Sequence, residues 1–193
     1  MPPPHRYIAA HATLANGDVD LCLLPEVPIV EEGPLGFLPH IERVLQKRGH
    51  AVIVVAEGAG EEVMGQSATV DAGGNRKLPP IDKWMKEKIA DYFKPKGIET
   101  TVKYIEPSYM VRSVPANAQD SYDCALFGQG AVHGTMAGYT GFTVGLVNNH
   151  TVLIPIPALA ANSPRSMNCR GRTWERVLSI THQPNTVPPK RTA

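Results

Sequence analysis

The chain has 193 residues, of which 42% are hydrophobic, so it contains enough apolar material to bury the core of one globular domain. Its 19 Lys and Arg residues almost balance its 18 Asp and Glu residues. A nearly neutral chain without a basic cluster is not typical of a protein that binds duplex nucleic acid, because such binding depends on positive charge. We therefore expect no nucleic-acid partner.

The three cysteines, Cys22, Cys124 and Cys169, are far apart and form no CxxC pair, and no histidine stands at metal-ligand spacing from them. The sequence therefore predicts neither a disulfide framework nor a zinc site. Free thiols favour a reducing, cytoplasmic setting. The apolar stretch 151–161 is too short to span a bilayer and contains two prolines, so no membrane association is expected.

The first part of the chain alternates between helix and strand patterns. Small and apolar residues predict a helix over 8–17, and the run VDLCLL predicts a buried strand over 19–24. A helix with one apolar face is expected over 38–50, followed by a continuous β-branched strand over 51–58. This order is a βαβ unit, which indicates an open α/β sheet.

The middle of the chain continues this alternation after a long loop. Residues 58–80 are rich in Gly, Ser, Asp and Pro and predict a loop. An amphipathic helix is expected over 81–93, ending before Pro95. The run TTVKYI then predicts a strand over 100–105, followed by a loop over 106–116.

The last part of the chain predicts a closely packed helix, two strands and a short helix. The helix of small residues is expected over 121–141, and the strands over 142–147 and 152–156, separated by an NNH turn. The final helix is expected over 172–180. We expect a folded region over 1–184 and a disordered, polar tail over 185–193.

Polar side chains follow two of the predicted strands. Glu26 comes directly after the strand 19–24, while Tyr109 and Arg112 follow the strand 100–105, which itself contains Lys103. In an open α/β sheet, ligands bind beyond the carboxyl ends of the strands. A carboxylate, a phenol and two cations in such a place suit a sugar phosphate.

Four long segments of the chain resemble the phosphofructokinases, in particular the ATP-dependent branch found in plants and trypanosomatids. The segments are IAAHATLANGDVDLCLLPE, HIERVLQKRGHAVIVVAEGAG, KYIEPSYMVRSVPAN and AVHGTMAGYTGFTVGLVNNHTVLIPIP. The resemblance runs from about Ile8 to Pro184 and implies the C-terminal part of a three-layer α/β sandwich. It further implies transfer of the γ-phosphoryl group of ATP to the 1-hydroxyl of fructose 6-phosphate, with Mg²⁺, by a homo-oligomeric enzyme.

The resemblance assigns six residues of this chain to fructose 6-phosphate: Glu26, Lys103, Tyr109, Met110, Val111 and Arg112. Glu26 matches a glutamate that accepts hydrogen bonds from the sugar hydroxyls. Tyr109 and Arg112 match positions that hold the 6-phosphate, and Lys103 matches a phosphate-contacting arginine of bacterial relatives.

Each assignment has a plainer alternative that the sequence leaves open. Glu26 stands between two prolines and could be a solvated loop charge. Arg112 could form a surface salt bridge, Tyr109 could be a half-buried packing aromatic, and Lys103 could face solvent from its strand.

The family binds the nucleotide phosphates on a GGDGT-type loop and activates the sugar 1-hydroxyl with an Asp of a TIDND-type segment. Neither segment occurs in these 193 residues. In place of the family's MGRxxGF motif the chain reads MPPPHRYI. The sequence therefore predicts no catalytic residue and no ligand for ATP or Mg²⁺ in this chain. A non-catalytic sugar-phosphate-binding or regulatory subunit, and a truncated gene product, remain the alternatives to part of an active kinase.

Overall fold

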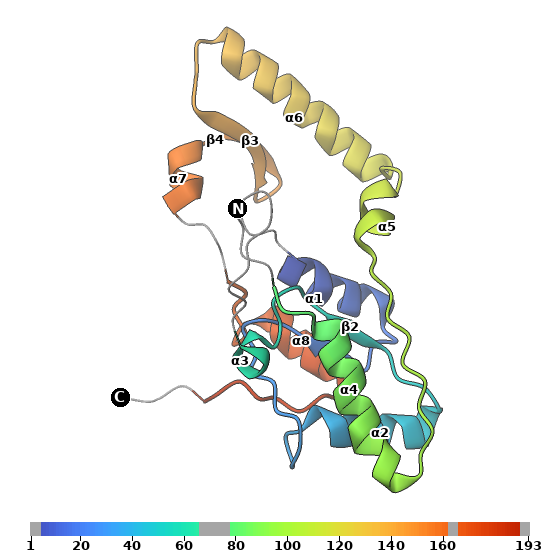
Figure 1. Cartoon of the computed structure of the whole chain (residues 1–193). Coiled ribbons are helices and arrows are strands. Elements are labelled where there is room, and N and C mark those ends of the chain that lie inside the picture. The colour runs from blue at the N-terminus through green and yellow to red at the C-terminus, as the bar shows by residue number, and fades with distance from the viewer. Residues whose placement is uncertain (1–4, 66–77, 162–165, 190–193) are drawn as a thin grey trace. The chain divides into compact units, whose positions relative to one another are not determined.

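The computed structural model describes residues 5–65, 78–161 and 166–189 (Figure 1). The chain forms two compact units. The larger unit contains the described parts of Pro3–Tyr104 and Ser166–Ala193, and the smaller unit contains those of Ile105–Arg165. No helix among the described residues is long and apolar enough to cross a membrane.

The larger unit is built around two parallel strands, β1 (Leu21–Leu23) and β2 (Ile53–Val55). Leu21 stands opposite Ile53, and the register continues to the pair of Leu23 and Val55. The connection between the strands contains α2 (Phe37–Arg48), which ends at Gly49 in the left-handed conformation. The predicted βαβ unit is therefore confirmed, with shorter strands than the sequence indicated.

Helices cover both faces of this small sheet. On one face, Leu21 and Leu23 pack with residues of α2 and of α4 (Ile81–Phe93). On the other face, Cys22 and Leu24 pack with α1 (His5–Asn16) and with Trp174 of α8 (Arg172–Thr181). The expected α/β class and three-layer sandwich are confirmed in this partial form.

The outer edge of β1 is closed by a side chain rather than by a strand. The Cys22 backbone N–H donates to Oε1 of Gln183 at 2.7 Å, and Nε2 of Gln183 donates to the Cys22 carbonyl at 3.0 Å. The amide thus makes both hydrogen bonds that a neighbouring strand would make at this residue. Because Gln183 follows α8, these two hydrogen bonds connect the segment after α8 to β1.

Asp20, just before β1, organises a buried polar cluster. Its Oδ1 accepts from Nη1 of Arg48 at 2.8 Å, and its Oδ2 accepts from the Val52 N–H at 2.9 Å. Nε2 of the buried His40 lies 2.8 Å from the Asp20 carbonyl oxygen. Burial is the main cause that lowers the pKa of His40 below its usual value, while the hydrogen bond to Asp20 acts in the opposite direction.

Two expectations for the middle of the chain are wrong. No strand forms over 100–105, where the backbone is extended but belongs to no ladder. The predicted loop 106–116 contains a short helix, α5 (Ser108–Ser113). The Val111 N–H closes its first turn by bonding to the Pro107 carbonyl at 2.8 Å, and proline suits a helix start because it lacks an N–H.

The predicted loop 58–80 contains one helical turn, α3 (Glu61–Met64), and its residues 66–77 lie outside the described part of the chain. A 3₁₀ turn, η1 (Lys94–Lys96), extends α4.

The smaller unit consists of a helix and a hairpin. α6 (Ala118–Met136) begins with a capping box between Asn117 and Asp120, and it covers most of the predicted helix 121–141. β3 (Phe142–Val147) and β4 (His150–Pro155) form the antiparallel hairpin that the two strand predictions indicated. Its turn, Asn148 and Asn149, has positive φ at both residues, as a two-residue hairpin turn requires. A further helix, α7 (Ile156–Ala161), was not expected.

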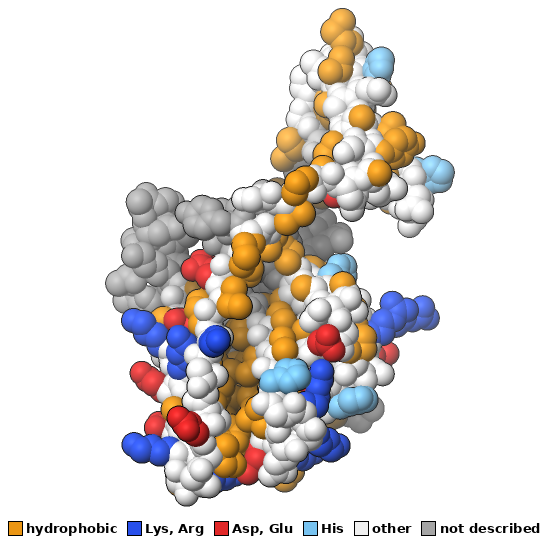
Figure 2. Space-filling model, turned by 90° about the vertical axis from the view of Figure 1, so that its right-hand side faces the viewer, with side chains coloured by type: hydrophobic (Ala, Val, Ile, Leu, Met, Phe, Trp, Pro, Cys, Tyr) orange, Lys and Arg blue, Asp and Glu red, His pale blue; other side chains and the backbone are white. Residues whose placement is uncertain are grey.

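Glycine allows α6 to approach the hairpin. Gly134 is the one buried residue of α6, and a Cβ at that position would lie 2.6 Å from Cζ of Phe142. Other large apolar side chains of this unit, such as Val132, Met136 and Tyr139, are exposed, and Figure 2 shows hydrophobic side chains on its surface. The described part of the unit therefore has little core of its own.

Residues 185–189 are the first part of the predicted tail, and two of them make hydrogen bonds with other residues of the larger unit. Oγ1 of Thr186 donates to the Pro28 carbonyl at 2.6 Å, and Nη2 of Arg170 donates to the Pro188 carbonyl at 2.9 Å. Residues 190–193 lie outside the described part of the chain. The division into a folded region and a disordered tail stays a prediction.

The lowered pKa of His40 predicts a loss of stability in mild acid. Burial favours the neutral ring in the folded protein, so its contribution is complete above the unfolded pKa near 6.5 and is lost as the pH falls below it. We expect the melting temperature to fall more steeply below pH 6.5 in the wild type than in His40→Gln, which cannot become charged. Parallel curves for the two proteins would contradict this role, and His50→Gln, at an exposed site, is the matched control.

Gly134 and Gly128 provide a matched pair on α6. Gly128→Ala should stabilise the protein by up to about 1 kcal/mol, because no atom lies within 4 Å of the new Cβ and alanine favours a helix. Gly134→Ala should instead destabilise it by about 1–2 kcal/mol, because the new methyl overlaps the Phe142 ring. Urea unfolding of both variants measures the difference, and equal effects would show that α6 does not pack on the hairpin in this way.

Candidate functional site

Glu26 lies in the turn that follows β1, where the Val27 N–H bonds to the Leu24 carbonyl at 3.1 Å. Its side chain is half-buried, and Oε1 accepts from the Met167 N–H at 2.9 Å. Glu26 is therefore held at the carboxyl end of a core strand by the segment that precedes α8. It is not the freely solvated loop charge that the sequence left open.

Two further contacts fix the same loop. The Ile29 N–H donates to Oε1 of Glu62 in α3 at 2.5 Å, and Thr186 donates to the carbonyl of Pro28. Three separate parts of the larger unit thus bind residues 26–29. A loop fixed in this way can present a polar group to a ligand without a large entropic cost on binding.

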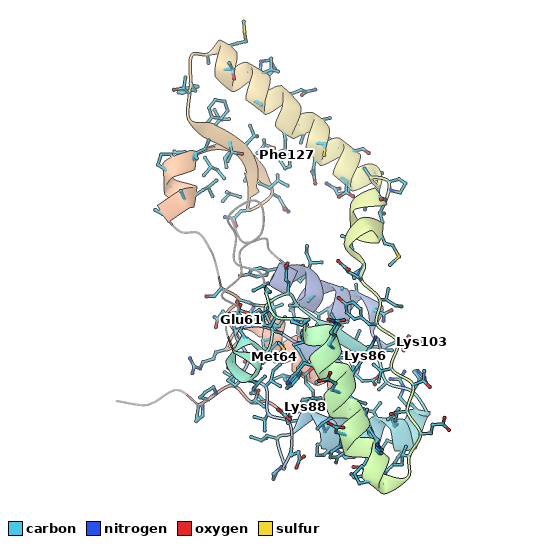
Figure 3. All side chains as sticks on the ribbon, viewed as in Figure 1. Glu61, Met64, Lys86, Lys88, Lys103 and Phe127 are labelled. Carbon is cyan, nitrogen blue, oxygen red and sulfur yellow. The ribbon has the colours of Figure 1, made fainter. Side chains whose placement is uncertain are left out.

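Lys103 lies on the extended segment that leads away from α4 (Figure 3). Its side chain is exposed, and within the described part of the chain it makes no hydrogen bond or ion pair. Lys86 and Lys88 of α4 are labelled in the same view, and Lys88 pairs with Glu31 at 2.6 Å. Lys103 is available to a ligand, although the predicted strand that would position it is absent.

The other four candidates are consecutive residues of α5. Tyr109 and Arg112 are three positions apart, and positions three apart on a helix lie on the same side. Their side chains lie outside what the structure describes. Met110 and Val111, which stand between these two residues in the sequence, are 56% and 53% exposed. These two apolar side chains are therefore not part of a hydrophobic core.

The six candidates therefore divide between the units. Glu26 and Lys103 belong to the larger unit, and the α5 residues belong to the smaller one. The binding roles of all six stay predictions. The hydrogen bond from Met167 joins residues 141 positions apart, so no local sequence signal could have indicated it.

Two hollows in the described structure do not involve these residues. They lie between α6 and the hairpin and have volumes of about 550 and 330 Å³. Phe127, which Figure 3 labels, lines the larger hollow with neutral residues such as Thr135 and Tyr139. A phosphate group needs cationic or N–H donors, so this lining does not suit one.

The described residues also contain no group of three His, Cys, Asp or Glu side chains that could hold a metal ion. The Mg²⁺ that the resemblance implies therefore finds no ligand set among them. The expectation that the chain itself supplies no metal ligand stays a prediction.

Fold and candidate residues together define part of a three-layer α/β protein with polar groups beyond its strand ends. No protein-family model matches the chain. Curated relatives, however, match nearly all of it.

The chain is 46% identical over 190 residues to ATP-dependent 6-phosphofructokinase 7 of Arabidopsis thaliana, a match that covers 97% of this chain and 39% of the relative. It is 45% identical over 185 residues to the ATP-dependent 6-phosphofructokinase of Borreliella burgdorferi, covering 92% of this chain and 41% of the relative. The enzyme of Trypanosoma brucei brucei is 38% identical over 178 residues, covering 91% and 36%.

The resemblance to the ATP-dependent phosphofructokinases is therefore confirmed over nearly the whole chain. The chain spans about two fifths of the length of these curated relatives. It corresponds to a part of such an enzyme.

The contact between Glu26 and Met167 predicts a structural cost that can be separated from ligand binding. Glu26→Ala leaves the N–H of the buried Met167 without its acceptor and should lower the free energy of unfolding by about 1–3 kcal/mol. Glu26→Gln keeps an acceptor oxygen and should cost less. Urea unfolding of the two variants measures the difference, and two equally stable variants would argue against this hydrogen bond.

Proposed function

We propose that this chain provides the fructose 6-phosphate-binding part of an ATP-dependent 6-phosphofructokinase. The observation that carries the proposal is the match of 46% over 97% of the chain to an enzyme of that name, which spans all six candidate residues. In the glycolytic reaction of such an enzyme, the γ-phosphoryl group of ATP passes to the 1-hydroxyl of fructose 6-phosphate.

In this proposal, Arg112 and Tyr109 bind the 6-phosphate. A guanidinium offers paired N–H donors to phosphate oxygens, and a phenol adds a third donor. Their spacing on α5 supports a common task, because it sets both on one side of the helix. Lys103 adds a positive charge, and the exposed Met110 and Val111 would contact the ligand through apolar surface or backbone groups.

Glu26 binds the sugar end of the substrate. A carboxylate can accept hydrogen bonds from two neighbouring hydroxyls, and the loop contacts described above limit its movement. Positioning of the acceptor hydroxyl is a large part of catalysis in phosphoryl transfer. The contribution of this chain is therefore orientation of the sugar, and the sequence contains no counterpart of the family's donor loop or base.

Whether the chain acts in a complete kinase or as a non-catalytic sugar-phosphate-binding or regulatory subunit depends on the groups that bind ATP and Mg²⁺. We propose that those groups do not come from these residues, and that the assembly is a homo-oligomer as in the family. The exposed apolar side chains of the smaller unit support association. We also propose a cytoplasmic location, which suits the three free cysteines, although some relatives are named chloroplastic.

Arg112→Ala tests the proposed phosphate contact. Fructose 6-phosphate at millimolar concentration should raise the melting temperature of the wild type, because a ligand that binds the native state stabilises it. Removal of a charge-assisted contact worth about 1.5–3 kcal/mol should weaken binding roughly ten- to a hundredfold and remove the shift.

Arg176→Ala is the matched control, because Arg176 is an exposed arginine of α8 outside the candidate site. It should keep the full shift. If Arg112→Ala responds to the sugar phosphate as the wild type does, α5 does not bind the 6-phosphate. If the wild type shows no shift, the proposed function itself is wrong.

A further inference from the structure

The turn between α1 and β1 contains the one Asn-Gly pair of the 193 residues, Asn16 and Gly17. Asn16 is the last residue of α1, and Gly17 has a φ of 71°, which is in the left-handed region. The Gly17 N–H donates to the Thr13 carbonyl at 3.3 Å, which is long for such a bond. Both residues of the pair are exposed, so solvent water reaches them.

The fold does not use the side-chain amide of Asn16. No described residue forms a hydrogen bond with it. By contrast, the side-chain oxygens of Asn117, Asn168 and Asn185 each accept a backbone N–H, at 2.9, 3.0 and 3.1 Å. The Asn16 amide is therefore free to turn toward the backbone nitrogen that follows it.

An amide in this position is open to attack by that nitrogen. The nitrogen of Gly17 bonds to Cγ of Asn16 and loses its proton, while the Cγ–Nδ2 bond breaks and ammonia leaves. Solvent water then opens the resulting succinimide ring at either carbonyl, which gives aspartate or isoaspartate. Glycine favours ring closure because no Cβ crowds the attacking nitrogen, and no atom lies within 4 Å of the place that a Cβ would take.

We propose that Asn16 is a site of spontaneous deamidation in the folded protein. The attack requires the last turn of α1 to open, and helix ends open at little cost in free energy. Only the long bond between Gly17 and Thr13 has to break, because the core contacts of α1 come from residues further back, such as the fully buried Ala10. The inference does not depend on the proposed function, since it concerns the larger unit alone.

The reaction should weaken the attachment of α1. Both products add a negative charge at the carboxyl end of the helix, where the last turn contains no basic residue and Asp18 follows closely. Isoaspartate also lengthens the backbone by one carbon. The other end of this short connection is fixed, because the buried Asp20 bonds to Arg48 and to the Val52 N–H. We therefore expect the protein to lose stability as it ages.

Peptide mapping by mass spectrometry of the full chain, incubated at mildly alkaline pH, measures the loss of each amide. Asn16 should convert at least about tenfold faster than the exposed Asn149, because a side-chain-bearing residue, His150, follows the latter. Asn16→Gln is the matched variant, since its amide would have to form a six-membered ring, and it should stay unchanged. Freshly prepared Asn16→Asp should melt about 1–3 °C below Asn16→Gln.

Equal rates at Asn16 and Asn149 would overturn the proposal. Conversion of Asn16 in urea but not in the folded protein would also overturn it, because the helix end would then protect the amide. The melting temperature of the wild type should fall during the incubation, and that of Asn16→Gln should not. An equal fall in both proteins would show that the reaction at Asn16 does not weaken the fold.

Discussion

The pairing of β1 with β2 is the interaction on which the rest of the larger unit depends. A parallel pair must be covered on both faces and satisfied along both edges, because its backbone groups are buried. The alternating residues of β1 send Leu21 and Leu23 to one helical layer and Cys22 and Leu24 to the other. The Gln183 amide then closes the outer edge at Cys22 and fixes α8 against the sheet. Among the described residues, none bonds to the backbone groups along the outer edge of β2.

The same pair of strands also positions the loop that contains Glu26. Glu26 is three residues beyond β1, and the contacts from Met167 and Glu62 set its loop at the strand end. In the smaller unit, α5 contains Tyr109 and Arg112 three positions apart, and a shared ligand for them stays a proposal. The exposed apolar surface around Met110, Val111 and α6 shows that the smaller unit, by itself, leaves much apolar area in water. Such a surface is typical of a segment that functions within a larger assembly.

Much of this fold could be predicted from local patterns, because the elements concerned carry their own signals. The apolar stripe of 81–93, the β-branched run before Gly58 and the Asn-Asn turn at 148–149 each indicated the right element. The prediction of a strand over 100–105 was wrong because β-branched residues favour an extended backbone but do not specify the neighbouring strand that completes a ladder. Sequence patterns do not predict α5, because a proline before a polar segment is typical of a loop as well as of a helix start. The contact of Glu26 with Met167 depends on the tertiary fold alone.

The proposed function requires a sugar phosphate, rather than phosphate alone, as the ligand of this chain. The proposed function needs both the sugar hydroxyls and the 6-phosphate, so neither fructose nor inorganic phosphate should be sufficient. Isothermal titration calorimetry of the chain with fructose 6-phosphate, fructose and inorganic phosphate measures this directly. We expect fructose 6-phosphate to bind at least about tenfold more tightly than inorganic phosphate and fructose to give no measurable heat. Equal affinity for the sugar phosphate and inorganic phosphate, or no binding of either, would contradict the assignment.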